Sequence, residues 1–133
     1  MDIRIYYEDT DSGGVVYHAN YLKYMERART EYFRNFGFFV AELARDGFVF
    51  PVIRLEIDFK APALHDNLLY VETSPTRVGG SSVTLCQKII RRSDGKLLVE
   101  GLVTLACISP TLKPRRIPLD IRRMLEEKLE TVV

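Results

Sequence analysis

The sequence predicts an α+β domain in which an antiparallel sheet of five strands wraps around one long helix. Apolar residues recur every three or four positions before Phe50 and every second position after it, which indicates a helix followed by strands. Short turns join most of these strands, and short turns favour antiparallel neighbours. The helix has an apolar stripe that can cover the apolar face of such a sheet. The length fits one domain, residues 1–133.

The first part of the chain predicts one strand and two helices. Ile3 to Glu8 is typical of a strand, and a turn-like segment follows from Asp9 to Gly14. A helix is predicted from Tyr21 to Phe36, with Gly37 ending it, and a short second helix is predicted over residues 40–45. The buried stripe of the long helix is predicted to contain Leu22, Met25, Ala28, Tyr32 and Phe36.

The second part predicts four strands and a last helix. Leu55, Ile57 and Phe59 alternate with charged residues, which predicts a half-buried strand that ends before Pro62. Residues 119–129 are typical of a charged amphipathic helix. The other strands are predicted over residues 68–77, 82–92 and 96–108, joined by the turns Gly79-Gly80 and Ser93-Asp94-Gly95.

The composition excludes several classes of protein. Lys and Arg number 19 and Asp and Glu 18, so the net charge of +1 gives no reason to expect nucleic acid or an anionic membrane as partner. No apolar run approaches the roughly 20 residues that span a bilayer, and the first residues lack the pattern of a signal peptide. We therefore expect a cytoplasmic protein without membrane insertion. Cys86 and Cys107 lie in strand-like runs and are interpreted as buried structural thiols.

The segment before the long helix has features of a catalytic loop. It places three carboxylates, Glu8, Asp9 and Asp11, within four positions, and Gly13 and Gly14 follow, where the backbone can turn sharply or approach a ligand. The segment leads into a helix start, whose unpaired N–H groups and positive dipole end can stabilise an oxyanion. A carboxylate beside it can act as nucleophile or base on a carbonyl substrate. The same residues also make an ordinary turn or helix cap, and the pattern alone does not distinguish thioesters from other carbonyl compounds.

Several positions of this segment and of the following helix form one motif. They are, in register, Arg4-Ile5, Thr10-Asp11, Gly14, Val15-Val16, Asn20-Tyr21 and the run Leu22-Lys23-Tyr24-Met25-Glu26-Arg27-Ala28-Arg29. The motif resembles the signature of the 4-hydroxybenzoyl-CoA thioesterase family, and most of all its Tol-Pal-associated acyl-CoA thioesterases. Chain length and strand order agree over nearly the whole domain. The resemblance implies the hot-dog fold and hydrolysis of an acyl-CoA thioester, with no metal or other cofactor.

The resemblance also implies roles for individual residues. Asp11 matches the family's catalytic aspartate, which acts as nucleophile or as base on a water. His18 lies at the oxyanion position, where its backbone N–H would polarise the thioester carbonyl. Gly14 would allow close passage of the backbone. Tyr7 and Tyr17 are candidates for lining the acyl pocket.

Other contacts of the substrate are less well determined. Ser82 matches a polar position that faces the active site in relatives, whereas Asp9 is expected to be a turn or cap residue. Coenzyme A carries phosphates, and the candidate cations for them are Arg77, Arg91-Arg92 and the run from Lys113 to Arg116. Relatives often carry a basic or larger polar side chain near Ser81, and it is absent here, so coenzyme A and an acyl-carrier protein both stay open as carriers. The acyl group also stays open.

Family members pair edge to edge with active sites between subunits, so the resemblance implies a homodimer or homotetramer. A lone domain would leave its sheet edges exposed. Hot-dog dehydratases use a histidine motif that neither His18 nor His65 shares, and the sequence has no Gly-x-Ser-x-Gly element of a serine hydrolase. The alternative from a different class is a non-catalytic acyl-thioester-binding or scaffold protein, against which Asp11 argues.

Overall fold

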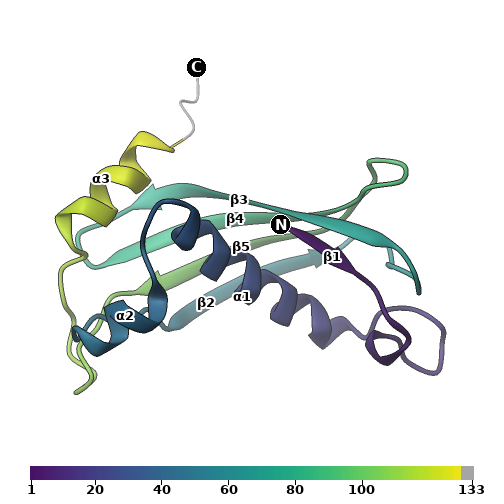
Figure 1. Ribbon diagram of the computed structural model, residues 1–133, viewed down its shortest axis with the longest axis horizontal. Coiled ribbons are helices and arrows are strands. Elements are labelled where there is room, and N and C mark those ends of the chain that lie inside the picture. Colours follow the sequence, from purple (N-terminus) through teal and green to yellow (C-terminus); the bar gives the residue numbers. More distant parts are fainter. Residues whose placement is uncertain (130–133) are drawn as a thin grey trace.

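The computed structural model describes residues 1–129 and confirms the α+β prediction (Figure 1). Its five-stranded sheet is antiparallel throughout. From edge to edge the strands are β1 (Asp2–Arg4), β3 (Leu68–Val78), β4 (Ser82–Arg91), β5 (Leu97–Ala106) and β2 (Val52–Phe59). The helices are α1 (His18–Asn35), α2 (Val40–Arg45) and α3 (Leu119–Glu127), and a 3-10 helix, η1, spans Tyr7–Asp9. Residues 130–133 of the predicted domain lie outside the described residues.

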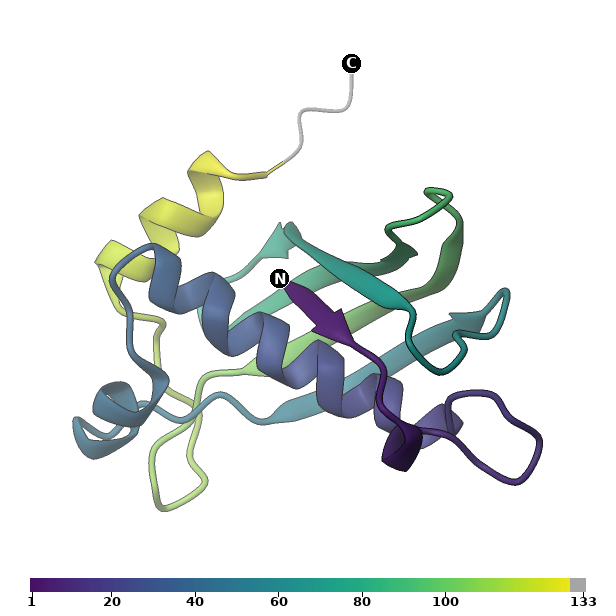
Figure 2. The same cartoon turned by 45° about the vertical axis from the view of Figure 1, so that its right-hand side comes forward.

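Helix α1 lies along one face of the curved sheet, as the hot-dog fold requires (Figure 2). It begins three residues before the predicted start and ends one residue before the predicted end. Gly37 follows it with φ +86°, the left-handed conformation that glycine adopts at no steric cost. The residues of α1 buried against the sheet are Tyr21, Tyr24, Met25, Ala28 and Phe33.

The predicted apolar stripe of α1 was therefore only partly right. Met25 and Ala28 are buried, but Leu22 and Phe36 are 41% and 37% exposed. Tyr32 is half-buried. The predicted stripe left out Tyr21 and Tyr24, whose rings turn inward and rotate the buried face of the helix toward themselves. Leu22 consequently lies on the next face of α1, four residues after His18.

The helix comes closest to the sheet over Gly101 of β5. A side chain there would place its Cβ 2.7 Å from Cε of Met25, so the position requires glycine or a displacement of Met25. Gln87, opposite Gly101 on β4, is fully buried. Its Nε2 donates to the main-chain oxygen of Met25 (2.9 Å) and to Thr73 Oγ1 (3.0 Å), and its Oε1 accepts a hydrogen bond from Arg29 (3.0 Å). Because all these partners are supplied by the protein, the amide can be buried at little cost.

The first strand is shorter than predicted, because the chain turns after Ile5 instead of continuing to Glu8. Asp9 causes the turn: its carboxylate accepts a hydrogen bond from the Tyr6 N–H at 2.8 Å, and its own N–H donates to the Tyr6 oxygen at 3.0 Å. These bonds close η1, a capping-box arrangement. The expectation that Asp9 is a turn or cap residue is thereby confirmed.

The strand predicted as half-buried, β2, is mostly exposed in the single chain. Its register with β5 places Leu55, Ile57 and Phe59 on the face that carries α1, yet Leu55 and Phe59 are 37% and 49% exposed and only Ile57 is half-buried. The reason is position, since β2 is an edge strand and α1 packs over the middle of the sheet. One chain thus leaves part of this apolar face open to solvent.

The remaining predicted elements occur close to their expected bounds. Helix α2 matches its prediction, and α3 ends two residues before the predicted end. Burial is confirmed for Cys107, where it raises the pKa of the thiol, whereas Cys86 is half-buried. Within residues 1–129 neither cysteine forms a disulfide.

Candidate active site

The segment with the predicted catalytic residues is a tight loop between η1 and α1, drawn at the lower right of Figure 1. Its two arms pair through an antiparallel bridge between Thr10 and Val16. The N–H of Asp11 donates to the Val15 oxygen at 2.9 Å, which extends this pairing by one residue. The loop is therefore a short hairpin, with Asp11 at the point where its turn begins.

Asp11 is exposed, and its carboxylate is held by its own turn. The N–H of Gly13 donates to Asp11 Oδ1 at 2.8 Å, and the N–H of Gly14 donates to the Asp11 main-chain oxygen at 3.0 Å. Gly14 closes the turn with φ +79°, which explains why glycine stands there. The second carboxylate oxygen, Oδ2, accepts no hydrogen bond from residues 1–129, so it can bind a water or a substrate.

The start of α1 follows the loop directly and is uncapped. Tyr17 is the N-cap residue, and its side chain makes no capping hydrogen bond. The N–H groups of His18 and Ala19, the first two of the helix, donate to no acceptor within residues 1–129. They present the positive end of an 18-residue helix, a site suited to an oxyanion.

A hollow of about 280 Å³ lies at this helix start. The exposed His18 ring stands at its wall, 4.6 Å from the Tyr17 ring and 6.2 Å from the Phe59 ring between centroids. The lining residues are Val16, His18, Tyr21, Phe59, Lys60, Ala61 and Pro62. Sequence reasoning missed Phe59 and Lys60, because they come from the end of β2 and only the fold brings them to the helix start.

Two of the predicted substrate-binding residues lie away from this hollow. Tyr7 is 79% exposed and packs edge-on against His65, with 6.0 Å between ring centroids. Ser82 begins β4 at the left end of the sheet in Figure 1, the end opposite the loop. A single chain therefore does not bring Ser82 to Asp11, and its predicted role requires a second subunit.

Three of the six predicted phosphate-binding cations, Arg91, Arg92 and Arg115, are already engaged within the chain. Arg91 donates to Asp94 and to the Pro62 oxygen, both at 3.1 Å, and Arg92 donates to Asp2 at 2.8 Å. The Arg115 guanidinium lies 3.9 Å from the centroid of Phe48. Arg77 forms no ion pair within residues 1–129. These contacts favour structural roles for the engaged arginines.

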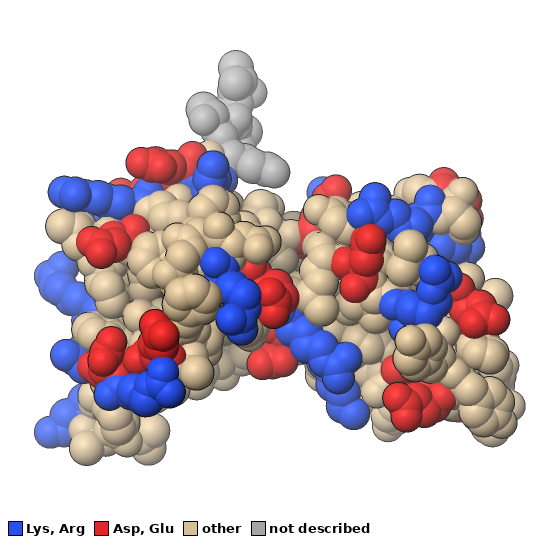
Figure 3. All heavy atoms as spheres, in the orientation of Figure 1, with Lys and Arg blue, Asp and Glu red and all other residues tan. Residues whose placement is uncertain are grey.

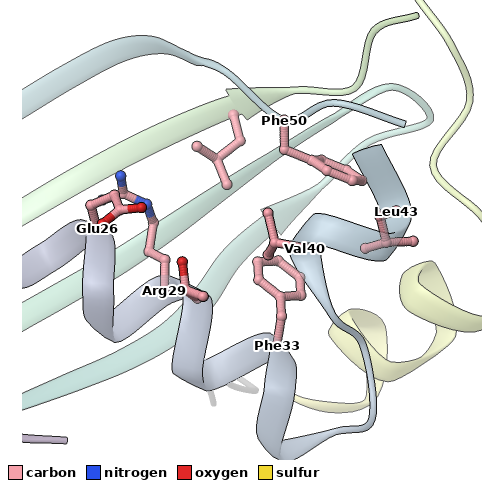
Figure 4. A pocket seen from close by; sticks show the side chains of 8 residues that line it. Glu26, Arg29, Phe33, Val40, Leu43 and Phe50 are labelled. Atoms are coloured by element: carbon pink, nitrogen blue, oxygen red, sulfur yellow. The ribbon is translucent and has the colours of Figure 1, made fainter. Parts of the chain in front are cut away.

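A second pocket, of about 90 Å³, lies between α1, α2 and β5 (Figure 4). Phe33, Val40, Leu43 and Phe50 form its apolar walls, and Arg29 stands at its polar side with Glu26 and Thr30. Burial lowers the pKa of Arg29. Asp11 is not among the residues that line this pocket.

On the face shown in Figure 3, basic and acidic side chains are interspersed, and neither charge forms a large patch. Within residues 1–129 no helix is long and apolar enough to cross a membrane. The same residues contain no group of three potential metal-binding side chains.

Comparison with known proteins decides the family. The model of the thioesterase superfamily matches residues 13–98, well over half of the chain. The chain belongs to this superfamily. The match begins two residues after Asp11, so the assignment is independent of that aspartate.

Members of the superfamily resemble the chain along nearly its whole length. The acyl-CoA thioester hydrolase YbgC of Escherichia coli O6:H1 is 40% identical over 120 residues, 90% of this chain and 89% of that protein. A probable thioesterase from Bartonella henselae superposes with a TM-score of 0.84 at 39% identity, covering 89% of this chain and 97% of the other. The gentisyl-coenzyme A thioesterase BH1999 gives a TM-score of 0.85 at 27% identity, covering 92% and 98%. The resemblance to Tol-Pal-associated thioesterases and the hot-dog fold are thereby confirmed.

Proposed function

We propose that the protein is an acyl-CoA thioesterase that releases a free carboxylic acid and coenzyme A, with Asp11 as the catalytic carboxylate. One observation carries the proposal: an exposed aspartate stands on a rigid turn that leads directly into an uncapped helix start beside a hollow. The names of the relatives support the substrate class, since the E. coli protein is an acyl-CoA thioester hydrolase.

The reaction follows from this arrangement. The thioester carbonyl oxygen would accept hydrogen bonds from the first N–H groups of α1, beginning with His18, where negative charge develops. Asp11 would either remove a proton from a water that attacks the carbonyl carbon, or attack that carbon itself to form an anhydride that water then cleaves. In the first route the carbon–sulfur bond then breaks, and the departing thiolate takes up the proton that Asp11 removed from the water. In the second route the thiolate leaves as the anhydride forms, and it takes up a proton released when water cleaves the anhydride and regenerates Asp11. The His18 ring and Tyr17 would line the path of the substrate.

The active unit is proposed to be a homodimer or a homotetramer. The open face of β2 offers Leu55 and Phe59, and Leu22 is exposed on the adjacent side of α1. Pairing two β2 edges would cover these side chains and remove an unpaired sheet edge. A second subunit would also complete the acyl pocket and is required for any contact with Ser82.

The remaining parts of the proposal concern the carrier and the setting. Coenzyme A and an acyl-carrier protein are both compatible with the site, and the protein is expected to act in the cytoplasm. An acyl-thioester-binding scaffold without turnover is the alternative, and the test below separates the two.

Thiol release from a panel of acyl-CoA substrates of different chain length tests the proposal. The native protein should turn over at least one of them, and Asp11→Asn should lower kcat by about 10²–10⁴-fold, the usual contribution of a catalytic acid or base. Asp66→Asn is the matched control, because it makes the same chemical change at another exposed aspartate. Equal turnover by the native protein and Asp11→Asn would overturn the role of Asp11. Binding without turnover by the native protein would favour the scaffold.

A further inference from the structure

The outgoing arm of the Asp11 loop is tied to the first turn of α1 by Asn20. The side-chain Nδ2 of Asn20 donates to the main-chain oxygen of Asp9 at 2.9 Å. The N–H of Tyr17 donates to the same oxygen at 3.0 Å. Because only Thr10 separates Asp9 from Asp11, this fixes the chain immediately before the catalytic carboxylate.

The returning arm is tied to the same turn of the helix by Tyr21, through one intermediate residue. The Tyr21 hydroxyl accepts a hydrogen bond from the Ala63 N–H at 3.0 Å, and the Ala63 oxygen accepts one from the Val16 N–H at 2.9 Å. Ala63 is fully buried and Tyr21 is 3% exposed. Water therefore has little access to replace the Tyr21 hydroxyl, and losing it would leave a buried donor without a partner.

Two consecutive residues of one helix thus hold both arms of the loop. We propose that Asn20 and Tyr21 are positioning residues, which set the separation between the Asp11 carboxylate and the first N–H groups of α1. The inference rests on the function proposed above. Such positioning is needed because Asp11 itself is exposed and, within residues 1–129, its carboxylate accepts a hydrogen bond only from its own turn.

The kinetic test uses substitutions that keep size and remove one hydrogen bond. Asn20→Asp has nearly the same shape but cannot donate to Asp9, and Tyr21→Phe keeps the ring beside the hollow but cannot accept from Ala63. A displacement of about 1 Å can cost about 100-fold in rate. We expect each variant to lose about 10–100-fold in kcat while KM changes less than about threefold. Removing a group that only binds substrate would raise KM instead.

Ile121→Val is the stability control, since Ile121 is buried in α3 at the far end of the sheet. It should lower the melting temperature and leave kcat unchanged. If kcat falls as much in Ile121→Val as in Asn20→Asp, or if Asn20→Asp retains the native kcat, the inference is overturned. Should Asn20→Asp fail to fold, Asn20→Ala removes the same donor without adding charge.

Amide hydrogen exchange tests, without any substrate, whether Asn20 and Tyr21 hold the loop. The hydrogen-bonded amides of Asp11 and Tyr17 should exchange at least about tenfold faster in Asn20→Asp, and that of Val16 in Tyr21→Phe, than in the native protein or in Ile121→Val. Unchanged exchange would overturn the inference. If the native protein hydrolyses no thioester, the proposed function fails, whereas exchange at these amides still decides whether Asn20 and Tyr21 hold the loop.

Discussion

The side-chain amide of Asn20 lies 2.9 Å from the main-chain oxygen of Asp9, a residue eleven positions earlier in the chain. This contact joins a surface loop to the helix that forms the centre of the fold. The candidate nucleophile or base, Asp11, is exposed, and its carboxylate is bonded to the N–H of Gly13 in its own turn, so its position depends on the backbone around it. Changes in that backbone should therefore affect activity as directly as changes in the carboxylate.

Gly14 is the backbone position where this dependence is easiest to test. Gly14→Ala introduces no collision, because no atom lies within 4 Å of the added Cβ, but φ is +79°. A non-glycine residue in this conformation costs about 1–2 kcal/mol. We expect a loss of that size in the free energy of unfolding, measured in urea, and a lower kcat, because the loop can relieve the strain by shifting Asp11.

Gly80→Ala is the matched control for this experiment. Gly80 does not have a positive φ, and the nearest atom to an added Cβ is Arg116 Nη1, at an ordinary contact distance of 3.8 Å. Stability and kcat should stay within error of the native values. A Gly14→Ala protein with native stability and native kcat would show that the turn does not constrain Asp11.

Local patterns predicted the elements of this fold because their signals are local. The alternation of Leu55, Ile57 and Phe59 lies within one strand, and the left-handed Gly37 stands only two residues after the end of α1. The burial of β2 was predicted less well, because it depends on which strand stands at the edge of the sheet. The order of strands in the sheet depends on the whole topology and cannot be inferred from the sequence of one strand.

The same reasoning applies to the candidate site. Asp11, Gly14 and His18 lie within eight consecutive residues, so a motif could identify them. Phe59 and Lys60 reach the hollow only because β2 ends beside the start of α1. The role of Ser82 stays a prediction, since one chain places it at the other end of the sheet and similarity to a motif position does not say which subunit would bring it to the site.

The exposed apolar face of β2 predicts that association depends on Leu55. Leu55→Lys places a charge among side chains that pairing would bury, so we expect a shift from dimer or tetramer toward monomer in sedimentation velocity. Turnover should fall in parallel, because the site is proposed to need two subunits. A Leu55→Lys protein that keeps the native sedimentation coefficient would exclude this face as the interface.

Asp58→Lys serves as the matched control for Leu55→Lys. Asp58 lies on the same strand but on the opposite face of the sheet, where its partner across β5 is Glu100. A lysine there adds the same side chain and relieves the pairing of two acidic residues. The sedimentation coefficient should stay at the native value. Dissociation by both substitutions would indicate that assembly does not depend specifically on the apolar face that carries Leu55.

We expect a substitution of Gln87 to lower stability because it leaves Arg29 without its acceptor. Gln87→Leu fits the buried volume but removes the acceptor of the Arg29 guanidinium, which lies 3.0 Å away. Hydrogen bonds to charged groups contribute about 1.5–3 kcal/mol. We expect the free energy of unfolding in urea to fall by about that amount.

The double variant Gln87→Leu/Arg29→Met isolates the cause. Removing the guanidinium together with its acceptor leaves no unsatisfied charge, so the double variant should lose less stability than the sum of the two single variants. Additive losses would mean that the two side chains do not interact in solution.

Because the hydroxyl of Tyr24 is buried, we expect the protein to lose stability in alkaline solution. Its ring is 2% exposed, and within residues 1–129 its hydroxyl has no hydrogen-bond partner. Burial first, and then the nearby Asp9, raise the pKa of Tyr24 well above its usual value of 10.0. Above about pH 10 the unfolded chain therefore loses a proton that the folded protein keeps, and the free energy of unfolding falls as pH rises.

Tyr24→Phe should reduce this pH dependence. Near pH 7 the substitution should be neutral or slightly stabilising, because it removes an unsatisfied buried hydroxyl. Between about pH 9 and 12 the variant should lose less stability than the native protein. Burial also raises the pKa of Tyr21 and Tyr32, so part of the decline will remain. Tyr6→Phe, at a ring that is 60% exposed, is the control, and the same alkaline decline in both variants would contradict the assignment to Tyr24.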